Sequence, residues 1–155
     1  MLTSYRTLII DDEEPARIGL TNLLAQFKDT FTLVGTAANG IEAKEKIEEL
    51  NPDLIFLDIE MPACNGFQML AQLKTLPIVV FCTAYNQYAL QAFETNSIDY
   101  IVKPVKAERI EKTVQKLQSF QKNSSQEDIL QVLKDISAQK QAEKMTSITV
   151  KKKDR

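Results

Sequence analysis

Short apolar runs alternate with longer amphipathic stretches along most of the chain. A continuous apolar run predicts a strand that is covered on both faces, and apolar residues spaced three or four apart predict a helix. By these patterns we expect strands over residues 5–10, 31–36, 53–57, 77–82 and 98–102. Helices are expected between and after them, over residues 14–27, 41–50, 67–74, 87–93 and 106–121.

Residues at the predicted helix ends support these bounds. Pro15 suits a first helical turn, where its missing N–H costs nothing. Asn39-Gly40 interrupts the chain before one helix, and Asn51-Pro52 ends that helix. In the first helix the apolar residues at roughly helical spacing are Ile18, Leu20, Leu23, Leu24 and Phe27. In the second, the predicted inner face is Ile41, Ala43, Ile47 and Leu50.

Strands that alternate with helices predict an α/β fold. Short right-handed crossovers between parallel strands give a doubly wound sheet, here a flavodoxin-like (βα)5 sheet with strand order 2-1-3-4-5. The composition changes at residues 123–125, and residues 126–144 are polar with a narrow apolar stripe. We therefore expect one domain over residues 1–122, a C-terminal linker helix over 123–145 and a further short segment over 146–155.

Composition limits the partners that this chain can have. Its 155 residues, 44% of them hydrophobic, are enough to bury a core. A net charge of −2 argues against non-specific binding of nucleic acid. No apolar run approaches the ~20 residues that cross a bilayer, and residues 1–6 lack a signal-peptide pattern. We therefore expect no membrane partner and a cytoplasmic location.

The chain contains no histidine, and its two cysteines are Cys64 and Cys82. The lack of histidine excludes a phosphohistidine donor, a Ser-His-Asp triad and an imidazole metal site in this chain. Two cysteines make neither a disulfide framework nor a zinc site. A bound metal would therefore be held by oxygen atoms, which suits Mg²⁺, Mn²⁺ or Ca²⁺.

Polar side chains follow four of the predicted strands, at the point where each strand ends. They are Asp11 and Asp12 after the first strand, Asp58 after the third, Thr83 after the fourth and Lys103 after the fifth. The carboxyl ends of parallel strands converge on one edge of such a sheet, where ligands bind. Taken singly, these residues have ordinary explanations, because Asp12 or Thr83 could cap the next helix and Lys103 could form a structural ion pair.

Three carboxylates at one edge favour a binding site. At ~4 Å and an effective dielectric of ~20, two like charges repel by about 4 kcal/mol. Either a proton is retained or a cation lies among Asp11, Asp12 and Asp58. Mg²⁺ takes one or two carboxylates and fills its shell with other oxygens, for which the backbone carbonyl of Glu60 is a candidate. Asp58 is then the candidate nucleophile, because a carboxylate can accept a phosphoryl group as an acyl phosphate.

Four segments carry these residues: Ile9-Ile10-Asp11-Asp12-Glu13, Leu57-Asp58-Ile59-Glu60-Met61-Pro62 with Asn65-Gly66, Thr83-Ala84, and Asp99-Tyr100-Ile101-Val102-Lys103-Pro104. In this order, over about residues 4–121, they resemble the receiver domain of two-component response regulators. The resemblance implies Asp58 as the phosphoacceptor and Asp11 and Asp12 as the acids that bind Mg²⁺, with Mn²⁺ as an alternative. It implies Thr83 and Lys103 as the pair that contacts the phosphoryl group.

The same resemblance implies a switch and a set of partners. Tyr100, three residues before Lys103, holds the family's switch position together with Thr83. The phosphoryl group would come from a sensor histidine kinase. Phosphorylation would favour a homodimer through the face formed by the fourth helix, fifth strand and fifth helix. The Lys103-Pro104 peptide is expected to be cis, which is an uncommon and specific geometry.

A narrower resemblance covers residues 81–93 and 97–100, which look like the receivers of LytTR-type transcriptional regulators. Those proteins carry a β-rich DNA-binding domain after the receiver, and only residues 146–155 could begin one here. The expected function is therefore a phosphorylated receiver that controls DNA binding and transcription through a domain missing from this chain. The receiver itself is expected not to be an enzyme, although it could take phosphate from small donors and lose it slowly.

Three other interpretations remain open. A degenerate receiver would bind a partner constitutively without taking phosphate. A Mg²⁺-dependent phosphatase with an aspartyl nucleophile would need a second acid, for which Glu60 is available, and a substrate pocket, for which no insertion is large enough. A flavin mononucleotide binder is disfavoured, because no Ser-, Thr- or Gly-rich phosphate loop follows the first strand.

Overall fold

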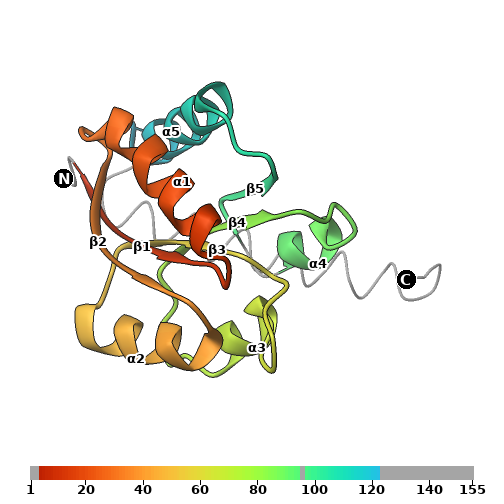
Figure 1. Cartoon of the computed structure of the whole chain (residues 1–155). Helices are drawn as coiled ribbons and strands as arrows, with labels where there is room; N and C mark the ends of the chain where they lie inside the picture. Colours follow the sequence, from red (N-terminus) through yellow and green to blue (C-terminus); the bar gives the residue numbers. More distant parts are fainter. Residues whose placement is uncertain (1–3, 95–96, 123–155) are drawn as a thin grey trace, which may run out of the picture.

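The computed structural model describes residues 4–94 and 97–122 of the chain. Figure 1 shows a central twisted sheet with helices on both faces. All its strand pairs are parallel, and the strand order is β2-β1-β3-β4-β5. The expected flavodoxin-like fold with strand order 2-1-3-4-5 is confirmed. The linker helix and the last segment, expected over residues 123–155, lie outside the described residues.

The strands are aligned so that their carboxyl ends meet at one edge. They are β1 (Tyr5–Ile10), β2 (Phe31–Ala37), β3 (Leu54–Leu57), β4 (Ile78–Thr83) and β5 (Asp99–Val102). Ile10 at the end of β1 is paired with Leu57 at the end of β3, and Leu57 is paired with Phe81 of β4. The residues that follow these positions therefore leave the sheet side by side.

Helices cover the two faces of the sheet in two layers. They are α1 (Glu14–Leu24), α2 (Gly40–Leu50), α3 (Gly66–Ala71), α4 (Ala89–Glu94) and α5 (Ala107–Lys122), with a short 3-10 turn, η1 (Ala25–Phe27), after α1. Figure 1 shows α1 and α5 on one face and α2 and α3 on the other. Among the described helices, none is long and apolar enough to cross a membrane.

Alternate residues of the central strands face the two helical layers. Leu57 belongs to a core cluster with residues of α2 and α3, whereas its neighbour Phe56 belongs to a second cluster with residues of α1 and α5. Every side chain of β3 is at most 1% exposed. A strand buried on both faces needs apolar residues at every position, which explains the unbroken apolar run in the sequence.

Two asparagines fix the ends of α2 as the sequence predicted. The Asn39 side chain accepts a hydrogen bond from the Glu42 amide at 2.8 Å, which is a standard N-cap. Asn51 lies in the left-handed region with φ 49°, and its amide donates to the Ile47 carbonyl. Asparagine tolerates this backbone conformation better than most residues. Pro52 cannot continue the helix, so the chain turns directly into β3.

Two apolar residues of the predicted helical patterns are exposed. Ile41 is 71% exposed and Ile18 is 54% exposed, so the assignment of Ile41 to an inner face was wrong. The buried positions of α1 are Leu20 and Leu24, and Ile18 lies two residues from the first of them, about 200° around the helix. Ile41 follows the buried Gly40 by one residue, which turns it about 100° away from the core face.

Helix ends differ modestly from the pattern. The first helix stops at Leu24 and continues as the 3-10 turn, where a regular helix was expected to residue 27. The helix expected over 67–74 spans Gly66–Ala71, and the helix expected over 87–93 spans Ala89–Glu94. The start of the former is set by Asn65, which forms a capping box with Gln68.

Candidate functional site at the carboxyl edge of the sheet

Strands β1 and β3 bring two carboxylates to the same edge. The Asp11 amide donates to the Ala37 carbonyl at 3.0 Å, and the Asp58 amide donates to the Ile10 carbonyl at 2.9 Å. Each aspartate therefore extends the parallel ladder by one step before the chain turns. Asp11 and Asp58 are both only 5% exposed, and Asp12 is half-buried.

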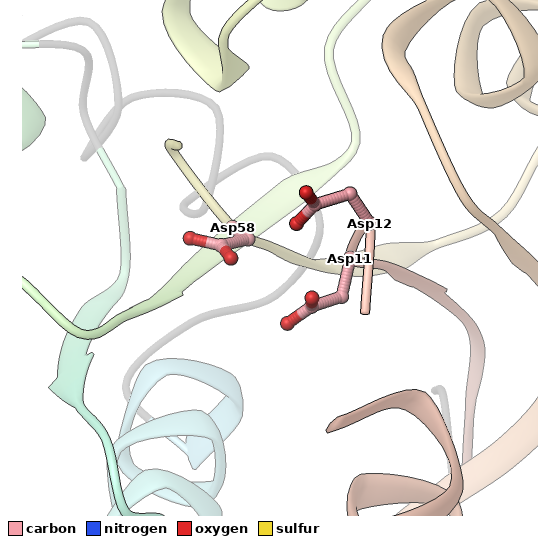
Figure 2. A group of neighbouring side chains, drawn as sticks. All are labelled: Asp11, Asp12 and Asp58. Atoms are coloured by element: carbon pink, nitrogen blue, oxygen red, sulfur yellow. The ribbon is translucent and has the colours of Figure 1, made fainter. Parts of the chain in front are cut away.

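The three acids form one cluster. Figure 2 shows the carboxylates of Asp11, Asp12 and Asp58 projecting to the same side of the strand ends. One oxygen of each lies within 4.8 Å of the others. Carboxylates at this spacing repel unless they take up a cation or a proton. An all-oxygen set with room for further ligands suits a hard cation such as Mg²⁺, so the residues present fit the ion.

The turn after β1 is held by Asp11. Its Oδ1 accepts a hydrogen bond from the Glu13 amide at 2.9 Å, and its carbonyl accepts one from Arg17 Nη1 at 2.7 Å. Glu13 is the N-cap residue of α1, and the helix has no side-chain cap. The alternative in which Asp12 caps the first helix is therefore wrong, and the Asp12 carboxylate faces the acidic cluster instead.

Lys103 reaches the acidic cluster from the end of β5. Its ammonium nitrogen lies 2.7 Å from Asp11 Oδ2 and 3.2 Å from Asp58 Oδ2. Its amide donates to the Thr83 carbonyl at 2.7 Å. The Lys103-Pro104 peptide is cis, as expected from the sequence. Lys103 therefore forms ion pairs, which is the structural role that the sequence allowed for it. One of its two partners is Asp58, the candidate nucleophile.

Burial and charge act in opposite senses on these groups. Burial raises the pKa of Asp58, the nearby Lys103 ammonium opposes this shift, and the charge of Asp11 adds to it. Burial alone would lower the pKa of Lys103, but its hydrogen bond to Asp11 and the charge of Asp58 raise that pKa above its ordinary value. Lys103 is therefore a cation at neutral pH, and Asp58 ionises less readily than an exposed aspartate does.

The side chains of Thr83 and Tyr100 both form hydrogen bonds with the backbone of Tyr85, in the loop between β4 and α4. Thr83 is the last residue of β4 and is completely buried, and its Oγ1 accepts a long hydrogen bond of 3.5 Å from the Tyr85 amide. The half-buried Tyr100 donates its hydroxyl to the Tyr85 carbonyl. Because α4 begins only at Ala89, Thr83 does not cap it.

The loop after Asp58 passes close to its own backbone. The Gly66 amide donates to the Ile59 carbonyl at 2.9 Å. A Cβ atom on Gly66 would lie 2.8 Å from the Asp58 carbonyl oxygen, so this approach requires glycine. The Glu60 amide donates to Asp58 Oδ1 at 3.3 Å. Glu60, whose backbone carbonyl is a candidate metal ligand, is therefore hydrogen-bonded to a member of the acidic cluster.

A buried charge network beside β5 was not predicted. Asp99 accepts hydrogen bonds from Arg109 at 2.7 and 3.0 Å, from Lys116 at 2.7 Å and from Thr113 at 2.7 Å. Burial alone would raise the pKa of Asp99, but these donors lower it from an ordinary 3.8 to about 2. The i, i+7 spacing of Arg109 and Lys116 on one helix was visible in the sequence, but their common partner was not.

A second unpredicted contact joins the loops after β3 and β4. Tyr88 donates its hydroxyl to Glu60 Oε2. This hydrogen bond to a carboxylate is the largest factor that raises the pKa of Tyr88. The tyrosines that follow Thr83 were a visible signal, although nothing in their spacing indicates a partner in another loop.

A groove of about 610 Å³ lies against α1 and the segment after β5. Asp11 and Lys103 line one part of it, and the rest is mostly apolar, with Leu20, Leu23 and Val105. Cys82 also lines the groove, and burial raises the pKa of its thiol to about 12. Only 4% of this cysteine is exposed and it belongs to the core cluster that includes residues of α1 and α5, in keeping with its position in an apolar strand.

Comparisons with known proteins identify the family. Residues 7–115 match the response regulator receiver domain. An uncharacterized response regulatory protein of Vibrio cholerae is 49% identical over 126 residues, which are 80% of this chain and 53% of that protein. The transcriptional regulatory protein BtsR of Salmonella typhimurium is 42% identical over 114 residues, which are 72% of this chain and 47% of BtsR. The chain spans about half the length of these curated relatives.

Solved structures agree with this result. The response regulatory domain of the protein mrkE from Klebsiella pneumoniae superimposes with a TM-score of 0.67 and 30% identity, over 77% of this chain and 99% of that domain. The response regulator domain of Thermotoga maritima CheB superimposes with a TM-score of 0.62 and 28% identity, over 77% of this chain and 97% of that domain. The described chain therefore belongs to the family of response regulator receiver domains, which are signalling domains.

Proposed function

We propose that this receiver accepts a phosphoryl group on Asp58 from a sensor histidine kinase, in a reaction that depends on Mg²⁺. The observation that carries this proposal is the contact of one buried carboxylate, Asp58, with both an acidic cluster and a lysine. The acids can hold a cation, and Lys103 can neutralise an incoming oxyanion. Phosphoryl transfer needs little else from a protein, because positioning and charge stabilisation supply most of the catalysis.

Asp11, Asp12, Asp58 and the backbone carbonyl of Glu60 are the proposed ligands of the ion. When bound, Mg²⁺ or Mn²⁺ would neutralise charge that builds up on the acids and on the phosphoryl oxygens. The family membership and the acidic cluster support this choice of ion. The raised pKa of Asp58 gives a further reason, because a cation among the acids lowers the free-energy cost of ionising it.

The proposed reaction uses one bond change at Asp58. A carboxylate oxygen of Asp58 forms a bond to phosphorus while the phosphorus–nitrogen bond of the kinase phosphohistidine breaks. The electron pair of that bond stays on the imidazole of the kinase, which takes a proton as it leaves. Lys103 moves from its carboxylate partners to a phosphoryl oxygen, and Thr83 donates its hydroxyl to another.

Phosphorylation would then change the loop between β4 and α4, to which both Thr83 and Tyr100 are hydrogen-bonded. The new group adds about two negative charges and several acceptor oxygens, which draw Thr83 Oγ1 away from the Tyr85 amide. The Tyr100 hydroxyl, bound to the carbonyl of the same residue, would be released to a new position. We propose that this change alters the face made by α4, β5 and α5, and that this face forms a homodimer.

The output that we propose is control of transcription through a DNA-binding domain outside this chain. The printed name of BtsR is that of a transcriptional regulatory protein, and the chain covers only 47% of it. Residues 81–93 and 97–100 resemble LytTR-type receivers, which suggests the class of that domain. A cytoplasmic location follows from this role, because both a kinase and DNA must be accessible.

The test is the intact mass of the protein after incubation with acetyl phosphate, with and without Mg²⁺. The proposal predicts one phosphate adduct that needs Mg²⁺ and that base hydrolyses. The matched control is Asp58→Asn, which should fold and take no adduct. A wild-type protein that stays folded and takes none would favour the degenerate receiver instead. Continuous release of phosphate from an external ester would favour the phosphatase.

A further inference from the structure

The carboxylate of Glu60 lies near the proposed phosphoacceptor and is bound by a residue of another loop. The Glu60 amide donates to Asp58 Oδ1 at 3.3 Å, which keeps this loop close to the reacting group. Its exposed side chain accepts a hydrogen bond from the hydroxyl of Tyr88, at Glu60 Oε2. The acidic side chain next to the proposed reaction site therefore has a partner in another loop.

The ring of Tyr88 packs in a cluster of aromatic side chains that is closed into a circuit by one hydrogen bond. Its ring packs edge-on against Phe67 at 6.1 Å and against Tyr85 at 6.3 Å between centroids. Phe67 packs on Phe81 at 5.1 Å, and Phe81 packs on Tyr100 at 6.2 Å. The hydrogen bond from the Tyr100 hydroxyl to the Tyr85 carbonyl closes the circuit. Because Phe81 is completely buried, the circuit is anchored in the core.

We propose that Tyr88 is a positioning residue that keeps the Glu60 carboxylate from turning towards Asp58, a role that rests on the proposed phosphorylation of Asp58. Phosphoryl donors are anions, and a carboxylate that turned towards Asp58 would repel them. The hydrogen bond from Tyr88 fixes that charge on the side of the loop between β4 and α4. Tyr88 contacts Glu60, Phe67 and Tyr85, and in this role it acts through Glu60.

The variant Tyr88→Phe tests this role, because it keeps the ring packing and removes only the hydroxyl. We expect it to form the Asp58 adduct from acetyl phosphate about threefold more slowly, or slower still, at fixed Mg²⁺. The comparison variant is Tyr85→Phe, which removes the same hydroxyl from the adjacent ring and should slow the reaction less than Tyr88→Phe does. Thermal melting of each variant checks that the fold is intact.

Two further readouts separate positioning of a charge from a structural effect. In a Glu60→Gln background the added Tyr88→Phe change should have no effect, because the charge that it releases is gone. The slowing should also shrink at high salt and with phosphoramidate, a donor of lower negative charge than acetyl phosphate. A structural role predicts the same slowing in both backgrounds, with both donors and at any salt concentration.

The outcomes distinguish this inference from the proposed function. If the wild type forms the adduct and Tyr88→Phe forms it equally fast, the positioning role is wrong and phosphorylation of Asp58 stands. Slowing that persists in the Glu60→Gln background also overturns the role, because Tyr88 would then act without Glu60. If the wild type forms no adduct, the proposed function itself fails, and the positioning role fails with it.

Discussion

Lys103 Nζ lies 3.2 Å from Asp58 Oδ2, and both side chains are largely buried. The same nitrogen lies 2.7 Å from Asp11 Oδ2, so one ammonium group bridges two of the three clustered acids. A lysine in this position would compete with a metal ion for the carboxylates, and it would also neutralise charge on a phosphoryl group at Asp58. The two roles predict opposite effects when the charge of Lys103 is removed.

Removing the Lys103 charge should tighten binding of the metal and slow phosphorylation. In Lys103→Met the acids lose their internal cation, so we expect Mg²⁺ to bind about tenfold more tightly, a change of ~1.4 kcal/mol. Adduct formation with acetyl phosphate at saturating Mg²⁺ should slow by about tenfold or more, because a cation that stabilises the transferred group is missing. Calorimetric titration and intact mass measure the two effects.

The charge-conserving variant Lys103→Arg provides the control for this prediction. It should keep the Mg²⁺ affinity close to that of the wild type, because the positive charge remains. Weaker Mg²⁺ binding in Lys103→Met would contradict the competition between the ammonium and the ion.

The Asp58→Asn variant should be more stable than the wild type in the absence of metal. The folded protein raises the pKa of Asp58, so this group favours folding only below its unfolded pKa, and that contribution is lost as pH rises. At neutral pH the neutral amide removes this penalty, and we expect a gain of about 1 kcal/mol, or ~3–6 °C in melting temperature.

The comparison is made by thermal melting in EDTA. Addition of Mg²⁺ should then raise the melting temperature of the wild type more than that of Asp58→Asn, since the variant lacks one proposed ligand. An Asp58→Asn protein that melts lower than the wild type in EDTA would show that the carboxylate is well compensated without metal.

Asp99 should contribute stability that depends on pH in the opposite sense. Its pKa is lowered from 3.8 to about 2 in the folded protein, so its contribution is present above pH ~4 and is lost as pH falls toward about 2. That shift corresponds to about 2 kcal/mol of stability at neutral pH. We expect Asp99→Asn to lose this amount and to flatten the acid side of the stability curve, as measured by urea unfolding at several pH values.

The partner Lys116 provides a graded comparison for Asp99. Its side chain is 51% exposed, so Lys116→Met should cost less than 1 kcal/mol, as is usual for an exposed pair. Equal losses in Asp99→Asn and Lys116→Met would argue against a network centred on the buried carboxylate.

Replacement of glycine by alanine should change the stability of the protein in opposite directions at Gly66 and at Gly19. Gly66→Ala places a Cβ atom 2.8 Å from the Asp58 carbonyl oxygen, so the backbone of the proposed phosphoacceptor must shift. We expect a loss of about 1–3 kcal/mol and slower phosphorylation. Gly19→Ala, in the middle of α1 with no atom within 4 Å of the new Cβ, should instead stabilise the protein by about 1 kcal/mol. Chemical denaturation measures both changes.

Much of the fold could be predicted from the sequence because the strand signal is strong. A strand covered on both faces needs an apolar residue at each position, and β3 satisfies this requirement completely. The end of such a run marks the carboxyl edge of the sheet, so the sequence alone predicts that Asp58 and Asp11 lie at one edge. The asparagines at the two ends of α2 were equally predictable, since each acts locally as a helix cap.

The errors lie where local pattern and tertiary packing differ. Ile41 and Ile18 fit an apolar pattern at helical spacing, but both are exposed. Which side of each helix is buried depends on how the helix packs against the sheet. The hydrogen bonds from Tyr88 to Glu60 and from Tyr100 to the Tyr85 carbonyl join loops whose relative positions no sequence pattern encodes. Such contacts between loops are determined by the complete fold, so the pattern of residues along the chain does not predict them.

The most direct test of the central claim is to locate the phosphoryl group. The protein is phosphorylated with acetyl phosphate and Mg²⁺, the acyl phosphate is reduced with borohydride, and the modified peptide is sequenced by mass spectrometry. Our account predicts reduction of the aspartyl residue at position 58 to homoserine, with Asp11 and Asp12 unchanged. A modification at either of these two acids, or none at position 58 in a folded protein that carries phosphate, would contradict the account.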